Sequence, residues 1–264
     1  MKITFIGAGK MATAMAGGIV ERGVCAPADI IGTDVLPRAR QAFSDATGCQ
    51  TMEENHAAIA EADVIILAVK PQVAQMVLAP LNGHFHHALV VSIAAGLTLR
   101  SLIEWCQTNR VVRVMPNTPA LVGLGASAYA CADGVKQADR EAVEQILGAI
   151  GVVACMDEVH LDAVTGLSGS GPAYVFEFIQ AMIDGGVAMG LDAESAKTLT
   201  VQTLAGAAEM VSRGLGTPDE LRKAVTSPNG TTAAGLEVLA EGDLRGLMAH
   251  VIKRATERSL ELGS

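Results

Sequence analysis

The residues with the clearest chemistry lie at the start of the chain, where Gly7-Ala8-Gly9 is followed by Ala12. Residues 2–6 form a short apolar run that predicts a buried strand, and the small residues from position 10 onward predict a helix. A strand, a glycine turn and a helix start direct backbone N–H groups and the positive helix end at anionic oxygens. Gly7 would make the tight turn, Gly9 would let the backbone approach a pyrophosphate, and Ala12 would allow close helix–strand packing. The pattern predicts dinucleotide binding, with an ordinary strand-to-helix turn as the alternative.

The residues that would distinguish NAD from NADP follow a second predicted strand at residues 28–33. Asp34 stands where an acidic side chain typically binds the hydroxyl groups of the adenosine ribose, which favours NAD. Arg38 and Arg40 follow closely and are suited to the 2′-phosphate of NADP. An exposed helix face would explain both arginines equally well, and a helix cap before Pro37 would explain Asp34. The choice between the two cofactors stays open.

Two further predicted strands end in residues that would line a cofactor crevice, because ligands of doubly wound sheets bind beyond the carboxyl ends of the strands. Residues 63–69 are the clearest strand, which ends at Lys70-Pro71 because proline cannot continue a central strand. Residues 88–93 end in Ala94-Ala95-Gly96, small residues that leave room for a ligand.

A fifth predicted strand, residues 111–115, runs into Pro116-Asn117-Thr118-Pro119. The two prolines make a stiff loop that could hold the Asn117 amide toward a nicotinamide, although a rigid turn is the interpretation we favour. Two more short strands are predicted at residues 126–130 and 151–155, with some antiparallel pairing at the sheet edge. Connecting helices are predicted at residues 52–62 and 136–150.

Beyond residue 157 the strand signals stop, and helical stretches rich in Ala, Gly and Leu run to the end of the chain. Two loops interrupt these helices. Ser168-Gly169-Ser170-Gly171-Pro172 precedes an apolar helix at residues 173–189, and Ser227-Pro228-Asn229-Gly230-Thr231-Thr232 opens a helix from residue 233. Hydroxyl groups, a glycine turn and a helix N-terminus make the second loop a good carboxylate cradle. Two well-capped helices are the alternative interpretation.

The composition of the chain limits the kinds of molecule with which it can interact. The 264 residues carry a net charge of -9, which argues against nucleic acid, and 50% of them are hydrophobic. No apolar run approaches the ~18 residues of a membrane span, so we expect apolar surface to be hidden between subunits. Residues 196–211 are apolar on nearly every face and predict a wholly buried helix. A small helical domain has little interior for such a helix, which favours an intertwined homodimer.

The cysteines and histidines indicate neither disulfides nor a metal site. Five scattered cysteines without a C-x-x-C pair are typical of buried thiols in a reducing cytosol, and the chain opens directly on a strand, so we expect a cytoplasmic protein without a leader. His84, His86 and His87 lack the ligand spacing of a zinc site, and we interpret them as part of an exposed loop.

The element pattern predicts an α/β fold in two parts. Residues 1–158 would form an N-terminal Rossmann-like doubly wound sheet that binds the dinucleotide. Residues 159–264 would form an all-α domain for dimerisation and substrate binding, with the boundary near Val159.

Five motifs in the order GAGKMATA, ILAVKP, RVMPNTP, TGLSGSGPAY and SPNGTT resemble pyrroline-5-carboxylate reductases over essentially the whole chain. The resemblance implies hydride transfer from NADPH, or from NADH, to a cyclic imine in the last step of proline biosynthesis. It also implies a Rossmann domain, a helical dimerisation domain and, in many members, a ring of dimers.

The resemblance assigns site residues as well. The implied cofactor contacts are Gly7, Ala8, Gly9, Lys10, Met11, Ala12, Asn55, Ala68, Val69, Lys70, Pro71, Ala94 and Ala95. In the implied substrate loop, Ser227 and the N–H groups of Gly230 and Thr231 hold the substrate carboxylate, and Thr232 hydrogen-bonds the ring nitrogen. Asn229 is also assigned to substrate binding as part of this loop; it stands where many relatives carry glycine, so the turn is expected to differ slightly.

The residue types present suit this chemistry. A cyclic imine can enter already protonated, so the protein mainly has to align the hydride donor and hold the carboxylate. No lysine occurs between Lys136 and Lys197, which weakens the alternative of a β-hydroxyacid dehydrogenase with a catalytic lysine on the long helix after the sheet. An intact carboxylate loop argues against the other alternative, a non-catalytic dinucleotide-binding regulator.

Overall fold

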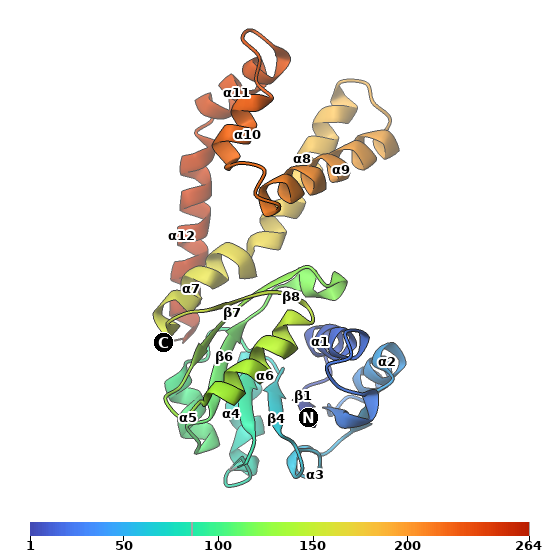
Figure 1. Cartoon of the computed structure of the whole chain (residues 1–264), viewed down its shortest axis with the longest axis vertical. Helices are drawn as coiled ribbons and strands as arrows, with labels where there is room; N and C mark the ends of the chain where they lie inside the picture. The colour runs from blue at the N-terminus through green and yellow to red at the C-terminus, as the bar shows by residue number, and fades with distance from the viewer. Residues whose placement is uncertain (86, 264) are drawn as a thin grey trace. The chain divides into compact units, whose positions relative to one another are not determined.

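The structure is a computed structural model that describes residues 1–85 and 87–263. An eight-stranded sheet has the strand order β3-β2-β1-β4-β5-β6-β7-β8. Figure 1 labels β1, β4, β6, β7 and β8 of this sheet. The strands are β1 (Ile3–Ile6), β2 (Ile30–Thr33), β3 (Gln50–Met52), β4 (Val64–Leu67), β5 (Leu89–Ser92), β6 (Val111–Met115), β7 (Gly125–Cys131) and β8 (Gly151–Cys155).

The sheet is parallel except at β7, which runs antiparallel to β6, while β8 pairs with β7 in parallel. Ile3 on β1 lies between Ile30 of β2 and Val64 of β4, so the fingerprint strand is central. The strand order reverses direction between β1 and β4, and this switch point is where doubly wound sheets bind their ligands. The predicted Rossmann-like fold class is confirmed.

Both faces of the sheet are covered by helices, which explains why the central strands are continuously apolar. Ile3 and Phe5 of β1 belong to one core and Ile6 belongs to the other, because successive side chains of a strand point to opposite faces. The first core is closed by α1 (Lys10–Glu21), α2 (Pro37–Thr47) and α6 (Gln137–Gly148). The second core is closed by α3 (Asn55–Ile59), α4 (Pro71–Leu78), α5 (Leu99–Cys106) and α7 (Leu161–Val164).

The chain forms two compact units, and the first is discontinuous. Unit 1 comprises Met1–Pro172 together with Ile252–Ser264, and unit 2 comprises Ala173–Val251. The long helix α12 (Leu244–Gly263) therefore begins in unit 2 and ends in unit 1. Short helical turns complete unit 1: η1 (Pro27–Asp29), η2 (Ala79–Leu81), η3 (Thr118–Val122), η4 (Glu158–His160) and the π-helix η5 (Thr165–Gly169).

Unit 2 is helical and exposes much apolar surface when the chain is alone. It contains most of α8 (Gly171–Ala188), then α9 (Ala193–Ser212), α10 (Pro218–Ala224) and α11 (Thr231–Glu241). On α9, which the sequence predicts to be wholly buried, only Ala196 and Thr200 are buried, and on α8 Phe176 is 64% exposed. This apolar surface is what a partner subunit would have to cover.

Two local predictions differ from the structure. Residues 52–62 are not one helix, because β3 takes Met52 and α3 spans only Asn55–Ile59. The segment at residues 168–172 is not an open loop, because α7 continues through η5 into α8. Ser170 N donates to Thr165 O at 2.8 Å, the hydrogen bond from residue i to residue i−5 that defines a π turn. The serines and glycines of this segment therefore belong to a widened turn of a helix and not to a loop.

All five cysteines are free thiols. Burial raises the pKa of Cys106 to about 12 and that of Cys131 to about 11, so both stay protonated at neutral pH. In the part of the chain that the structure describes, no helix combines the length and the apolar character that crossing a bilayer requires.

Candidate active site

The turn between β1 and α1 is fixed by contacts that only glycine allows. Gly7 has a φ of 101°, and its N–H donates to Thr33 O on β2 at 2.8 Å. A Cβ at Gly7 would lie 2.8 Å from the carbonyl oxygen of Ala68, at the end of β4. Gly7 therefore lies where the ends of the neighbouring strands β2, β1 and β4 come together, and only glycine fits there.

The residues after this turn form a cradle that fits a pyrophosphate. Gly9 is the N-cap of α1, and a Cβ built on it would meet no atom within 4 Å. Among the described residues, the backbone N–H groups of residues 9–12 have no acceptor. Ala12 is fully buried against the sheet, so a larger side chain could not replace it without displacing the helix. Free N–H groups at a helix N-terminus facing open space are what a dinucleotide pyrophosphate needs.

Asp34 lies beside this cradle at the end of β2, and the backbone holds its carboxylate. Asp34 Oδ2 accepts a hydrogen bond from Ala8 N at 3.1 Å, and Oδ1 accepts one from Leu36 N at 2.9 Å. The carboxylate is thus oriented over the glycine turn, where the adenosine ribose of a dinucleotide would lie.

The two candidate phosphate-binding arginines differ in whether their side chains are already bonded within the protein. Arg40 Nη1 donates to the backbone oxygen of Asp34 at 2.6 Å, and Nη2 pairs with Glu53 at 3.1 Å. Arg38 is exposed and has no side-chain partner among the described residues. Of the two arginines, Arg38 is therefore the one available to a 2′-phosphate.

The other predicted cofactor residues gather at the carboxyl ends of adjacent strands. Asn55 opens α3, and its Oδ1 accepts from the Thr33 hydroxyl at 2.5 Å, while its amide nitrogen has no hydrogen-bond acceptor among the described residues. Ala68 follows β4 and donates its N–H to Ile6 O at 2.8 Å. Val69 and Lys70 lead into α4, whose first residue is Pro71.

Beyond β5, Ala94 is buried and Ala95 is exposed. Asn117 is 8% exposed, and both ends of its amide are used: Nδ2 donates to Ser168 O at 3.0 Å, and Oδ1 accepts from Ala126 N at 2.8 Å. These bonds favour the rigid-turn interpretation of Asn117 over a contact with the nicotinamide.

In unit 2, the predicted substrate loop has the features of a carboxylate site. Among the residues described here, the N–H groups of Thr231 and Thr232 have no acceptor, and both side chains are exposed at the N-terminus of α11. The Gly230 N–H, which the resemblance assigns to the carboxylate, donates instead to Ser227 O at 3.1 Å. A Cβ at Gly230 would overlap the Ser227 hydroxyl, so a larger residue there would require that hydroxyl to move away from its present position.

Asn229 adopts a left-handed conformation with a φ of 60°. Asparagine tolerates this region better than other residues with a side chain, which explains how it replaces glycine here.

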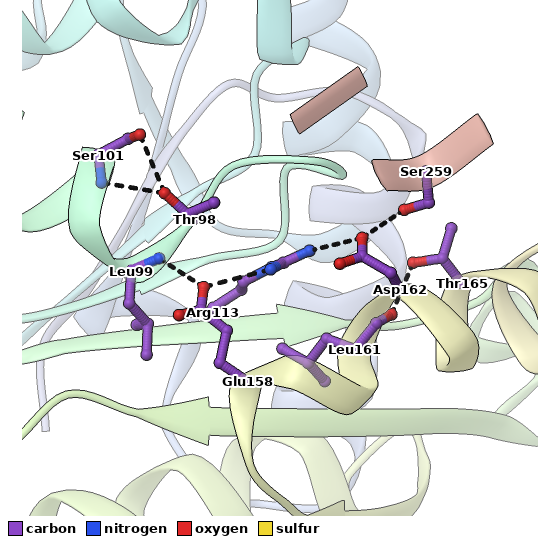
Figure 2. Close-up of polar contacts among 9 residues, drawn as sticks. All are labelled: Thr98, Leu99, Ser101, Arg113, Glu158, Leu161, Asp162, Thr165 and Ser259. Carbon is purple, nitrogen blue, oxygen red and sulfur yellow. Dashed lines mark hydrogen bonds and ion pairs between the residues drawn. The ribbon is translucent and has the colours of Figure 1, made fainter. Parts of the chain in front are cut away.

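One buried cluster was not predicted. Arg113 on β6 is 5% exposed and pairs with Glu158 and Asp162, and Asp162 also accepts from Ser259 on α12 (Figure 2). A lone arginine within the apolar strand VVRVM was the available signal, because a buried guanidinium requires carboxylate partners.

The histidine loop contains one contact that sequence spacing did not predict. His84 Nε2 lies 3.1 Å from Nε2 of His56, at the start of α3. Within residues 1–85 and 87–263 no three His, Cys, Asp or Glu side chains are grouped to hold a metal ion. His86 lies outside the described residues.

Comparison with known proteins identifies the family. A profile described as pyrroline-5-carboxylate reductase dimerisation matches residues 158–262, and one described as NADP oxidoreductase coenzyme F420-dependent matches residues 2–96. The chain is 42% identical over 259 residues to a pyrroline-5-carboxylate reductase of Glycine max, covering 98% of this chain and 94% of that protein.

Two solved structures are similar over the full length. A pyrroline-5-carboxylate reductase of Coxiella burnetii has a TM-score of 0.93 and 35% identity, and the match covers 100% of this chain and 98% of the other. The enzyme of Plasmodium falciparum, solved with NADP bound, has a TM-score of 0.91 and 32% identity, with the same coverage. The chain belongs to the pyrroline-5-carboxylate reductase family.

Proposed function

We propose that this chain reduces the C=N bond of 1-pyrroline-5-carboxylate to give L-proline, the last step of proline biosynthesis, with hydride from NADPH or NADH. The observation that carries the proposal is the presence of two separate anion cradles. Residues 9–12 suit a pyrophosphate, and the N-terminus of α11 suits a carboxylate. A reductase of a carboxylate-bearing imine needs one cradle for the cofactor and one for the substrate. Full-length relatives named for this activity support the same conclusion.

We infer that NADPH is the main cofactor and that NADH also serves. The match to an NADP oxidoreductase profile and the relative with NADP bound support NADPH. The exposed guanidinium of Arg38, which has no partner among the residues that the structure describes, is suited to a 2′-phosphate, whereas the Asp34 carboxylate is suited to ribose hydroxyl groups. The proposed cofactor contacts are the N–H groups of residues 9–12, with Asp34, Asn55, residues 68–71, Ala94 and Ala95 around them.

The bound nicotinamide supplies the hydride, and the chain's own residues bind and orient the two reactants. In the substrate loop, the free N–H groups of Thr231 and Thr232 and the Ser227 hydroxyl hold the carboxylate. The Thr232 hydroxyl hydrogen-bonds the ring nitrogen. Because the imine can enter already protonated, Thr232 serves mainly to position that nitrogen, and no strong acid is required.

The direct test is absorbance of the reduced nicotinamide after the enzyme is mixed with pyrroline-5-carboxylate and either NADPH or NADH. We expect rapid oxidation with formation of proline, and faster turnover with NADPH. Oxidation that is faster with NADH would mean that Asp34 outweighs Arg38 at the adenosine ribose. Absence of oxidation with both cofactors would contradict the proposed function.

Replacement of Thr232 by alanine tests the substrate loop. We expect kcat/KM for the imine to fall by roughly 10- to 100-fold, because a hydrogen bond to a charged group contributes about 1.5–3 kcal/mol. The dissociation constant for NADPH should stay unchanged. Thr232→Ser keeps the hydroxyl and should retain most of the activity, so equal losses in both variants would contradict the assigned role.

We further propose that the chain works in the cytoplasm as a homodimer, with a ring of dimers as the larger assembly. The exposed apolar residues of α8 and α9 and the match to a dimerisation profile support the dimer. In this arrangement residues 159–264 would serve both dimerisation and substrate binding. Sedimentation velocity should give the mass of a dimer or of a multiple of it, and a stable monomer would contradict the proposal.

A further inference from the structure

A polar network around the buried side chains of Arg113 and Ser259 joins the sheet of unit 1 to helix α12. Arg113 Nη1 lies 3.2 Å from Glu158 Oε1, and Nη2 lies 3.3 Å from Asp162 Oδ1. Ser259 donates its hydroxyl to the same Asp162 oxygen at 2.6 Å and is only 4% exposed. Figure 2 shows Asp162 lying between Arg113 and Ser259. One guanidinium thereby connects β6, η4, α7 and α12.

The same network holds the end of the loop that follows β5. Glu158 Oε1 accepts a hydrogen bond from Leu99 N at 2.7 Å, where α5 begins (Figure 2). Thr98 caps that helix by accepting from Ser101 N at 3.1 Å. The loop, residues 93–98, is therefore anchored to Arg113 through Glu158.

The last turn of α12 supports the middle of this loop. Gly96 has a φ of 78°, and a Cβ built on it would lie 3.5 Å from the carbonyl group of Leu262. An open pocket of about 210 Å³ lies beside the two segments. Its lining includes Ala95 and Gly96 on the loop, Ser259 and Leu262 on α12, and Thr165 and Ser170 at the π turn. The loop thus has α12 on one side and the Glu158 carboxylate at its end.

The strand order indicates which half of a dinucleotide this loop would meet. Asp34 follows β2, on one side of the fingerprint strand β1, and marks the adenosine half. β4 and β5 lie on the other side of β1, so the nicotinamide half extends over the residues that follow them. The exposed Ala95 is the residue of the loop that this half would approach.

We propose that the network of Arg113, Glu158, Asp162 and Ser259 positions the loop at residues 93–98. Through this network the C-terminal helix α12 controls how tightly the nicotinamide half of the cofactor binds. The nicotinamide role rests on the proposed function. If the loop is always in the conformation that binds the cofactor, the cofactor binds with its intrinsic Kd. If the loop is in that conformation only for a fraction f of the time, the apparent Kd is higher by a factor of 1/f. Arg113, Asp162 and Ser259 are positioning residues that need no contact with cofactor or substrate.

Ser259→Ala tests the network most directly, because it removes one hydroxyl group and leaves the ion pairs of Arg113 intact. Ser212→Ala is the matched control: Ser212 is an exposed serine on a helix, without a side-chain hydrogen bond among the described residues. The first measurement is hydrogen exchange of the ligand-free proteins, followed by mass spectrometry of peptides that cover residues 93–99. Because loss of a typical hydrogen bond corresponds to roughly fivefold in an equilibrium constant, we expect exchange there to be about 3- to 10-fold faster in Ser259→Ala and unchanged in Ser212→Ala.

The second measurement compares two ligands by isothermal titration calorimetry. NADPH spans the whole site, whereas 2′,5′-ADP carries only the adenosine half. For Ser259→Ala we expect the Kd of NADPH to rise about 3- to 10-fold and the Kd of 2′,5′-ADP to stay within twofold of the parent value.

The outcomes separate the positioning role from the proposed function. Unchanged exchange at residues 93–99 would overturn the positioning role, as would an equal loss of affinity for both ligands, which indicates a general structural defect. Faster exchange in a protein whose unmodified form binds no NADPH would support the positioning of the loop and refute the proposed cofactor.

Discussion

A Gly9→Val variant is expected to fold normally and to lose at least about 100-fold in affinity for NADPH. Gly9 has an ordinary φ of -78°, and a Cβ there would meet no atom within 4 Å, so the protein itself accommodates a side chain. We expect the valine to take up space that the pyrophosphate needs, because Gly9 is the N-cap of α1 and the N–H groups of residues 10–12 have no acceptor among the described residues. A dinucleotide that cannot reach those groups loses several charge-assisted hydrogen bonds, each contributing about 1.5–3 kcal/mol. Calorimetric titration with NADPH and thermal unfolding of the same sample measure the two expectations together.

Gly17→Val is the matched control for this variant. Gly17 lies on the same helix, and a Cβ there also meets no atom within 4 Å, but it is about two turns away from Gly9 and more than one turn beyond the last residue of the cradle. Its affinity for NADPH should equal that of the parent protein. Gly7 would be a poor choice, because its φ of 101° and its contact with Ala68 O make any side chain a folding defect. Unchanged NADPH binding by Gly9→Val would refute the pyrophosphate cradle.

Arg113→Met is expected to lower the free energy of unfolding by about 3–5 kcal/mol. Methionine keeps much of the volume but removes the only cation paired with Glu158 and Asp162 in this network of described residues. Two partly buried carboxylates, with Asp162 14% and Glu158 32% exposed, would then lie close together without a cation, which costs more than the loss of a fully exposed ion pair. Urea unfolding followed by circular dichroism measures the change.

A matched surface variant separates this effect from the loss of any arginine. Arg213 pairs with Glu209 on α9, but its side chain is 70% exposed. Arg213→Met should leave the urea midpoint almost unchanged, because water already solvates both partners. In the double variant Arg113→Met and Asp162→Asn, removal of one carboxylate should recover part of the lost stability. Equal stability of Arg113→Met and the parent protein would mean that the buried network contributes little.

The parallel sheet was largely predictable because its strands are buried on both faces. Residues 111–115 match β6 in full, and the apolar run at residues 63–69 contains β4. β3 was missed because Gln50-Thr51-Met52 is short, edge-located and partly polar, so it has none of the apolar signal of a central strand. The π turn at η5 was missed for a different reason, since its serines and glycines are also typical of loops.

In the candidate site, too, the local features were predictable from the sequence and the long-range contacts were not. The fingerprint turn is a local feature, so the identity and spacing of Gly7, Gly9 and Ala12 were enough to predict it. The partners of Asn117 and Gly230 depend on how the folded backbone closes, which composition does not specify. The bond between Asp162 and Ser259 joins residues 97 positions apart, and no sequence pattern relates them.

The discontinuity of unit 1 has a consequence for the order in which the protein is made. Residues 1–172 leave the ribosome first, but the helix that supports Gly96 and bonds Asp162 arrives only after the whole of unit 2, Ala173–Val251. At roughly 5–20 residues per second, translation of unit 2 takes about 4–16 s. During that interval the nascent sheet lacks its α12 partner, and the loop after β5 has no support from that side. The loop at residues 93–98 is therefore one of the last parts of unit 1 to reach its final form, although it precedes the whole of unit 2 in the sequence.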